Sequence, residues 1–352
     1  MKRWLLVGLA LTAGCSDALE QTSSAGQVIG VVNSVDRTLS IISATDFTVS
    51  TRTWPGGGGS PTTIAGRGNV FVVPLGPADS AGVSFLRSGC RDLCPLSDFA
   101  FALPAGSGAT GVAIQDDSVA WIANPNLHTV TRLNYLTGDT TSIAVGVYPQ
   151  AVAIVGTRIF VVNGNLVSGT PAGPSWLTSF DCCSVTTSDS IPLTGTNARF
   201  AVVGDDSLLY VVASGHVGAA DGKLSIVDPK APAAHGEIAV LNGLGESPGP
   251  AAFHPSGRLL ISSQTEGILE VYVPTRSLTR GPGNGVKPGG DGVSGLAVDL
   301  RGRVYAVPAL PPPEFCAVRG VVHVLSAPPD YRDFRTVTVG FCPASAAVAA
   351  TP

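Results

Sequence analysis

The chain repeats itself at intervals of 40 to 51 residues, and this repeat constrains the fold more than any other feature. Each repeat contains a short apolar strand centred on an alanine. These alanines are Ala65, Ala113, Ala153, Ala201, Ala252, Ala297 and Ala347. The intervals between them are 48, 40, 48, 51, 45 and 50 residues. Such a period is typical of four-stranded propeller blades, whereas an irregular all-β sandwich would not explain it.

A second strand follows each alanine strand, and in most repeats an aromatic residue leads it. These strands are 71–74, 121–124, 160–163, 210–213, 260–263 and 305–308, with 31–33 as a seventh copy that lacks the aromatic. Alternating runs such as 129–133 and 140–145 supply the third and fourth strands. Short runs of this kind, bounded by Gly, Pro, Asn and Asp, are typical of half-buried strands. The 43 Gly and 27 Pro residues then serve as turns between many short strands.

The two ends of the repeat array complement each other. Residues 28–33 form a second strand with no first strand before it, and residues 343–348 form a first strand with no second strand after it. The last strand can therefore complete the first blade and close a ring. The sequence predicts a single all-β domain over residues 28–352, a seven-bladed β-propeller of four-stranded antiparallel blades, closed by a C-terminal strand in the first blade.

The segment before residue 28 is typical of an export signal. Lys2 and Arg3 precede an apolar run over 4–13, which is too short to span a bilayer and fits a secretory signal peptide over residues 1–14. The junction Leu-Thr-Ala-Gly-Cys at 11–15 resembles a bacterial lipoprotein signal, although Thr12 stands where that family usually has Leu, Val or Ile. The resemblance implies that Cys15 carries a lipid.

Residues 15–27 would then be a flexible tether between the lipid and the folded body. The sequence predicts a protein of the bacterial cell envelope, lipid-anchored at the outer membrane or the periplasmic face. Ordinary secretion, with Cys15 lost in the signal peptide, is the alternative.

Six further cysteines remain in the predicted propeller, and an even number in an exported chain predicts disulfides. They are Cys90, Cys94, Cys182, Cys183, Cys316 and Cys342. The fold places Cys316 and Cys342 on one rim, in the seventh and the closing blade. A bond between them would secure the seam of the ring by restricting the unfolded chain.

The other four cysteines leave more than one pairing open. Cys90 and Cys94 share a loop of the second blade and are expected to pair locally. Cys182 and Cys183 are adjacent, and they could form a vicinal disulfide, remain free thiols, or pair with Cys90 or Cys94. A metal site at Cys182 and Cys183 is less expected, because no histidine lies at ligand spacing and no CxxC partner is present.

The repeat pattern resembles seven-bladed propellers of the YVTN and NHL types, including the lactonase-like group, over nearly the whole mature chain. The best-matching stretches are 160–163, 223–228 and 250–257. This resemblance implies a fold that hosts many different activities.

Residues 291–299 and 302–305 are similar to a strand pair of gluconolactonase-type propellers, in which an Asp binds a divalent metal in the central channel. That similarity points to Asp291 as a metal ligand. The Glu and Asn ligands that the family needs from other blades have no convincing counterpart here, and Ca²⁺ requires six or more oxygen ligands. Asp116 and Asp117, Asp205 and Asp206, and Asp299 recur at equivalent positions between first and second strands, which indicates turn caps.

The sequence says more about where a ligand would bind than about what it is. The net charge of −4 gives no basic surface for nucleic acid. HExxH and HxxxH patterns are absent, so no zinc hydrolase is indicated. Long loops gather on one rim of the predicted ring, where binding residues are usually found. These loops are 163–175, 213–222, 281–292 and 309–320.

Asn163 and His216 lie in these loops and are candidate ligand-binding residues. We expect a binding or scaffolding module with an unknown protein or glycan ligand, no cofactor, and membrane contact through a lipid anchor only. The alternative function is a metal-dependent lactonase-like hydrolase that uses the central channel. A subunit of an envelope redox or polysaccharide system is a third possibility.

Overall fold

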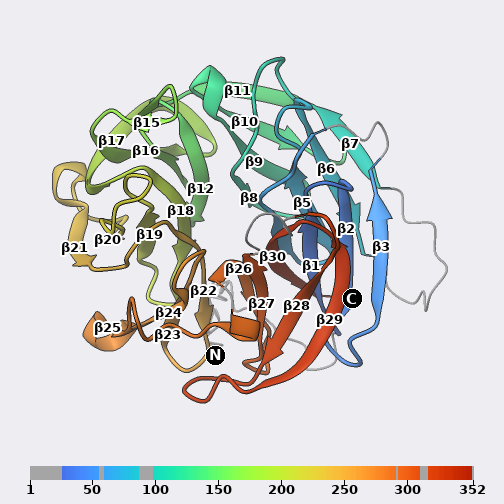
Figure 1. Cartoon of the computed structure of the whole chain (residues 1–352). Helices are drawn as coiled ribbons and strands as arrows, with labels where there is room; N and C mark the ends of the chain where they lie inside the picture. The colour runs from blue at the N-terminus through green and yellow to red at the C-terminus, as the bar shows by residue number, and fades with distance from the viewer. Residues whose placement is uncertain (1–25, 55–58, 87–97, 291, 310–315, 351–352) are drawn as a thin grey trace, which may run out of the picture.

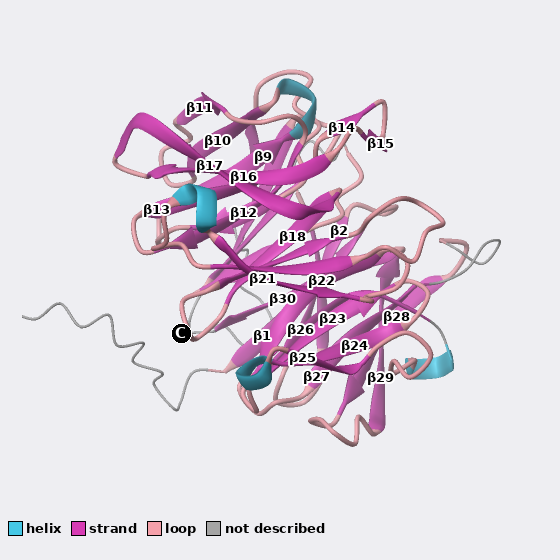
Figure 2. Cartoon of the chain, turned by 90° about the vertical axis from the view of Figure 1, so that its left-hand side faces the viewer, coloured by secondary structure: helices cyan, strands magenta, loops and turns pink. Residues whose placement is uncertain are grey.

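The computed structural model describes residues 26–54, 59–86, 98–290, 292–309 and 316–350. Seven four-stranded antiparallel sheets surround a central axis (Figure 1), which confirms the predicted seven-bladed propeller. The described helices are four short 3-10 turns at the periphery of the strands (Figure 2). These are η1 (Pro125–Leu127), η2 (Ala233–His235), η3 (Val273–Thr275) and η4 (Pro288–Gly290). No helix in the described ranges is long and apolar enough to cross a membrane.

Each blade runs outward from the axis in four strands. The innermost strands, in ring order, are β30 (Pro343–Ala350), β4 (Ala65–Arg67), β8 (Val112–Ile114), β12 (Pro149–Val155), β18 (Ala198–Val203), β22 (Pro248–His254) and β26 (Gly292–Val298). The second strands are β1 (Gln27–Asn33), β5 (Val70–Pro74), β9 (Val119–Asn124), β13 (Arg158–Asn163), β19 (Leu209–Ala213), β23 (Arg258–Ser263) and β27 (Val304–Ala309).

The outer half of each blade follows in the same order. The third strands are β2 (Thr38–Ser43), β6 (Ser80–Phe85), β10 (Thr129–Asn134), β16 (Pro174–Asp181), β20 (Lys223–Val227), β24 (Gly267–Tyr272) and β28 (Arg319–Leu325). The fourth strands are β3 (Val49–Thr53), β7 (Phe99–Ala102), β11 (Thr140–Ala144), β17 (Ser184–Thr196), β21 (Glu237–Asn242), β25 (Ser277–Arg280) and β29 (Asp333–Phe341). All seven repeat alanines lie in innermost strands, as the sequence predicts.

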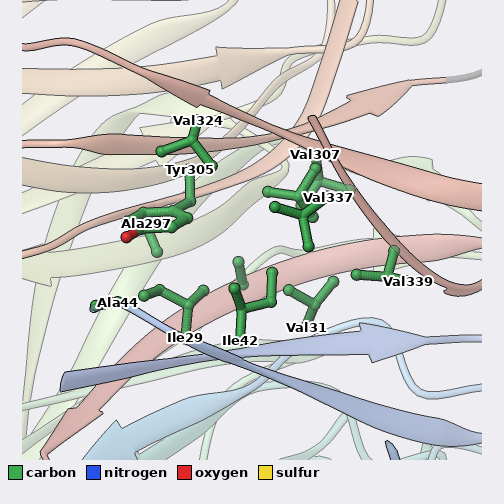
Figure 3. Close-up of a cluster of buried hydrophobic side chains, with 12 residues drawn as sticks. Ile29, Val31, Ile42, Ala44, Ala297, Tyr305, Val307, Val324, Val337 and Val339 are labelled. Carbon is green, nitrogen blue, oxygen red and sulfur yellow. The ribbon is translucent and has the colours of Figure 1, made fainter. Parts of the chain in front are cut away.

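The second strands carry the core of the ring. Their leading aromatic side chains are at most 1% exposed, and they are Phe71, Trp121, Phe160, Tyr210 and Tyr305. Each blade buries both faces against its neighbours. At the seam between the seventh and first blades, Ile29 and Ile42 lie opposite Tyr305 and Val337 (Figure 3). Burying an apolar side chain of this size contributes about 1.5–3 kcal/mol.

The closing strand occupies the predicted place. β30 pairs antiparallel with β1, from Gln27 opposite Ala350 to Asn33 opposite Pro343. Backbone groups at the end of β29 also bond across the seam to the first blade. The Gly340 N–H donates to Asn33 Oδ1 at 3.1 Å, and the Phe341 N–H donates to an Asp36 carboxylate oxygen at 3.0 Å. The ring is therefore closed both at the axis and between blades.

A disulfide joins Cys316 and Cys342, whose Cα atoms are 4.6 Å apart. This confirms the predicted pair. The bond ties the chain just before β28 to the residue between β29 and β30, next to the seam. Cys90 and Cys94 lie outside the described residues.

Replacing both Cys316 and Cys342 with Ser is expected to lower the free energy of unfolding. The bond closes a loop with a sequence separation of 26 residues, and the lost constraint on the unfolded chain corresponds to roughly 3.5 kcal/mol. Urea unfolding followed by intrinsic fluorescence measures this change. A reductant should destabilise the wild type more than the double variant, in which only the predicted Cys90–Cys94 pair remains to be reduced. Equal stability of the two proteins without reductant would contradict the prediction.

Candidate functional site

The loop-rich rim carries the two residues that the sequence proposes as ligand contacts. Asn163 ends β13 and is fully buried. Its Nδ2 donates to Thr178 Oγ1 at 2.9 Å, and its Oδ1 accepts the Gly146 N–H at 3.0 Å. Asn33 and Asn124 end their second strands in the same way and also donate to hydroxyl groups of the third strand. The Asn163 amide therefore braces its blade and joins it to the connection from the preceding blade.

His216 lies in the exposed loop between β19 and β20. Its ring Nδ1 is 2.7 Å from an Asp221 carboxylate oxygen, and its backbone N–H donates to the other oxygen at 2.9 Å. Burial opposes ionisation, but these hydrogen bonds hold the pKa of Asp221 below its ordinary value. The pair stiffens the loop and leaves the other ring nitrogen of His216 facing outward from this contact. Asp291, the candidate metal ligand, lies outside the described residues.

Bulges mark the beginnings of five of the seven innermost strands, namely β12, β18, β22, β26 and β30. Because neighbouring strands are antiparallel, these beginnings lie on the same rim as the loops between second and third strands. A bulge releases a residue from strand pairing and re-aims its side chain. The residues released from pairing lie on the innermost strands at this rim, and they are Gln150, Arg199, Gly249, Pro250, Ser294 and Ala344.

Arg199 is the charged member of this ring of bulged residues. Its side chain is solvent-accessible, and it forms no ion pair with any residue that the structure describes. Its guanidinium lies over the Phe200 ring at 5.5 Å. The surrounding protein lowers the pKa of Arg199 by desolvation, and Tyr148 opposes this effect. Arg199 is therefore an accessible but partly desolvated cation at the start of β18.

Hydrogen bonds hold the two residues that precede Arg199. Gln150 Nε2 donates to Asn197 Oδ1 at 3.0 Å and to the Ala198 carbonyl at 3.1 Å. Asn197 in turn donates to the Gly215 carbonyl at 3.1 Å, at the base of the His216 loop. Asn197 has a φ of 52°, a conformation that Asn tolerates better than most residues. The start of β18, and with it Arg199, is therefore fixed against β12 and against the loop that contains His216.

The channel walls carry almost no charge apart from arginine. Along the seven innermost strands the charged side chains are Arg67 and Arg199, and the same strands contain no Asp or Glu. His254, which ends β22, is buried and bonded to Ser256 and to the Gly302 carbonyl. A cavity of about 490 Å³ occupies the end of the channel beside Arg67, lined mainly by small apolar residues of β8, β12 and β18. The two arginines are therefore the charged side chains of the innermost strands, one at each end of the channel.

Three of the acidic residues near the inner strands have structural partners. Asp116 accepts the N–H groups of Ser118 and Val119, and Asp206 accepts that of Leu208. Asp299 caps its turn in the same manner and also pairs with an arginine of the following strand. The predicted turn-capping role of this recurring Asp is thereby confirmed.

Potential metal ligands gather elsewhere. Among the described residues, one group of three lies close together, and it consists of Asp181, Cys182 and Cys183 at the outer edge of the fourth blade. Cys182 and Cys183 are free thiols with their sulfur atoms 3.2 Å apart, beyond the roughly 2.05 Å of a disulfide. Desolvation and the neighbouring Cys183 raise the pKa of Cys182 to about 11. The structure thus matches the free-thiol alternative and not a vicinal disulfide, which would need a distorted peptide bond.

Comparison with known proteins identifies the fold and leaves the function open. No family model matches the sequence, and no curated protein matches it. A protein of unknown function from Desulfotomaculum acetoxidans has a similar structure, with a TM-score of 0.64 and 13% identity over 92% of this chain and 98% of that chain. Apo AztD from Citrobacter koseri has a TM-score of 0.57 and 10% identity, over 93% of this chain and 98% of that one.

An enzyme has the same fold as well. Virginiamycin B lyase from Staphylococcus aureus, in a catalytically inactive form with quinupristin, has a TM-score of 0.58 and 13% identity over 82% of this chain and 94% of that chain. At these identities the likenesses show the propeller fold alone. The finer resemblance to YVTN- and NHL-type propellers stays a prediction.

Proposed function

We propose that this protein is an exported, lipid-anchored binding module that holds a ligand with an anionic group at the mouth of its central channel, on the loop-rich rim. The observation that carries the proposal is Arg199, an accessible cation with no ion-pair partner among the described residues. A guanidinium presents its donors in a planar fork that matches carboxylate, phosphate and sulfate groups. An anion bound there would supply the missing partner.

The rest of the channel supports this assignment. The innermost strands carry no carboxylate that could compete with the ligand for Arg199. Phe200, which is partly exposed and whose ring centroid lies 5.5 Å from the Arg199 guanidinium, offers an aromatic ring beside the charge. A cation next to an aromatic ring suits an acidic sugar or an acidic peptide segment, the two ligand classes that a protein or glycan partner would present.

Replacing Arg199 with Gln should weaken binding of an anionic ligand at least tenfold, because a hydrogen bond to a charged group contributes about 1.5–3 kcal/mol. Calorimetric titration with uronic-acid oligosaccharides and with acidic peptides, at two salt concentrations, measures the loss and identifies the class. Arg67→Gln is the matched control, since Arg67 lies in the same channel at its other end. Failure of both ligand sets to bind, or equal affinity of Arg199→Gln and wild type, would refute the proposal.

The lipid anchor rests on the segment from Lys2 to Cys15. Metabolic labelling with a fatty acid should label the wild-type protein and leave Cys15→Ala unlabelled. Absence of label on the wild type, or label that survives Cys15→Ala, would contradict the anchor without affecting the binding site.

The metal-dependent hydrolase has less support. A hard cation in the channel would need several converging oxygen ligands, and the described innermost strands supply none from Asp or Glu. We therefore propose the binding module alone.

A further inference from the structure

The hairpin between β16 and β17 has a turn made entirely of cysteine. Asp181 pairs with Ser184, and Cys182 and Cys183 are the two residues between them. The Cys182 N–H donates to the Thr157 carbonyl at 2.8 Å, which fixes the turn against the connection between β12 and β13. A turn between third and fourth strands lies on the rim opposite the channel mouth with Arg199. Any ligand of this hairpin would therefore be separate from the proposed anionic ligand.

The three ligand atoms of the hairpin already lie close together. The two sulfur atoms are 3.2 Å apart, and both lie within 4.8 Å of an Asp181 carboxylate oxygen. Tetrahedral coordination with Zn–S bonds of about 2.3 Å places two sulfurs ~3.8 Å apart, so a small side-chain rotation would admit an ion. Cys183 is exposed and Cys182 partly buried, which gives the ion a path from solvent.

The Asp181 carboxylate is held in place by neighbouring groups. Thr157 Oγ1 donates to one of its oxygens at 2.7 Å, and the Cys183 N–H donates to the other at 2.9 Å. Hydrogen bonds of this kind orient a metal ligand before the ion arrives. Each oxygen keeps a further lone pair for coordination. Arg158, on the neighbouring strand β13, places positive charge near Asp181 and the two thiols, which would otherwise be strongly negative once ionised.

We propose that Asp181, Cys182 and Cys183 form a binding site for a thiophilic divalent cation, with Zn²⁺ as its representative. Two thiolates and one carboxylate match the ligand preferences of Zn²⁺, and softer thiolates favour it over Mg²⁺ or Ca²⁺. Three protein ligands leave the fourth tetrahedral position open to water or to a group from a partner.

Zn²⁺ titration against a chromophoric chelator tests the site, with Co²⁺ as a spectroscopic probe of thiolate coordination. The protein is the full chain with Cys15, Cys90 and Cys94 replaced by Ser, so that the remaining free thiols are Cys182 and Cys183. We expect one equivalent of Zn²⁺, loss of binding in Cys183→Ser, and at least tenfold weaker binding in Asp181→Asn. Asp189→Asn is the matched control, because this carboxylate is in the same hairpin and pairs with Arg158.

Three results would overturn the proposal. The first is absence of stoichiometric Zn²⁺ binding by protein whose thermal unfolding matches that of the wild type. The second is binding that survives Cys183→Ser or that is the same in Asp181→Asn and Asp189→Asn. The third is a Cys182–Cys183 disulfide in protein purified without reductant, because the thiolate is the form that binds metal. None of these results bears on Arg199.

Discussion

A chain that ends at Cys342, and so lacks β30, should lose the cooperative unfolding of the intact ring. β30 is the innermost strand of the first blade, and it contacts β26 of the seventh blade and β4 of the second. Its removal exposes the inner edge of β1 and the apolar groups that Ala346 and Ala349 cover. Urea unfolding by circular dichroism, together with size-exclusion chromatography, should show an expanded protein with a broad transition.

Two control chains test whether the ring needs β30 itself or needs β30 at the C-terminus. A chain that ends at Ala350 should unfold like the wild type. A permuted chain, with residues 343–350 placed before Gln27 through a short turn, should regain a compact fold, because Ala350 lies opposite Gln27 in the native pairing. A truncated chain that stays compact and cooperative would show that the ring does not need its closing strand.

Replacing Glu270 with Ala should destabilise the sixth blade by about 3 kcal/mol, the scale for breaking a buried ion pair. Glu270 is 4% exposed, and its carboxylate pairs with Arg258 at 3.0 Å. It also accepts bonds from Thr279 in its own blade and from Tyr331 in the seventh blade. Removing the carboxylate leaves these donors unpaired at the boundary between two blades. Asp139→Ala, at an exposed turn, is the control and should change stability by less than about 0.5 kcal/mol.

The same residue predicts a dependence on pH. Burial by itself would raise the pKa of Glu270, but hydrogen bonds from Thr279, Tyr331 and Arg258 outweigh it and hold the pKa below its ordinary value. A lowered folded-state pKa stabilises the protein above the unfolded pKa of about 4.3, and this stabilisation is lost as the pH falls through the folded value. Unfolding between pH 7 and pH 3 should therefore be less pH-dependent in Glu270→Gln than in the wild type. Parallel profiles would contradict this role.

The repeat predicts the architecture well because equivalent strands occupy the same structural environment in each of the seven blades. Every inner strand has to pack close to the axis, which selects small residues such as Ala201 and Ala252. Every second strand is buried on both faces, which selects large apolar side chains. The pairing of Cys316 and Cys342 follows once the strands of the seventh blade are assigned, because the antiparallel pairing of β28 with β29 brings the residues that flank this hairpin together. The β14 (Leu166–Val167) and β15 (Thr170–Pro171) hairpin escapes prediction because it is an insertion outside the repeat.

The candidate site is harder to predict because its signal is local backbone geometry. Apart from Arg199, the sequence of β18 is that of an ordinary inner strand. A bulge re-aims the Arg199 side chain, and this bulge cannot be predicted from the sequence. The charge of Arg199 could have identified it as a candidate from the sequence, because the innermost strands are otherwise almost uncharged. Asn163 illustrates the opposite case. Its recurrence at the ends of second strands, with Asn33 and Asn124, indicates bracing of the blade, as the recurring Asp indicates a turn.

The position of β1 between two neighbours has a mechanical consequence. Its outer edge pairs with β2 and its inner edge with β30, over most of its length. Tension applied through the chain ahead of Gln27 would have to slide β1 past both neighbours at once, so that the two ladders of hydrogen bonds share the load in shear. A single edge strand would instead peel away one bond at a time. A pulling force on the N-terminal segment would therefore act first on a strand that is hydrogen-bonded along both edges.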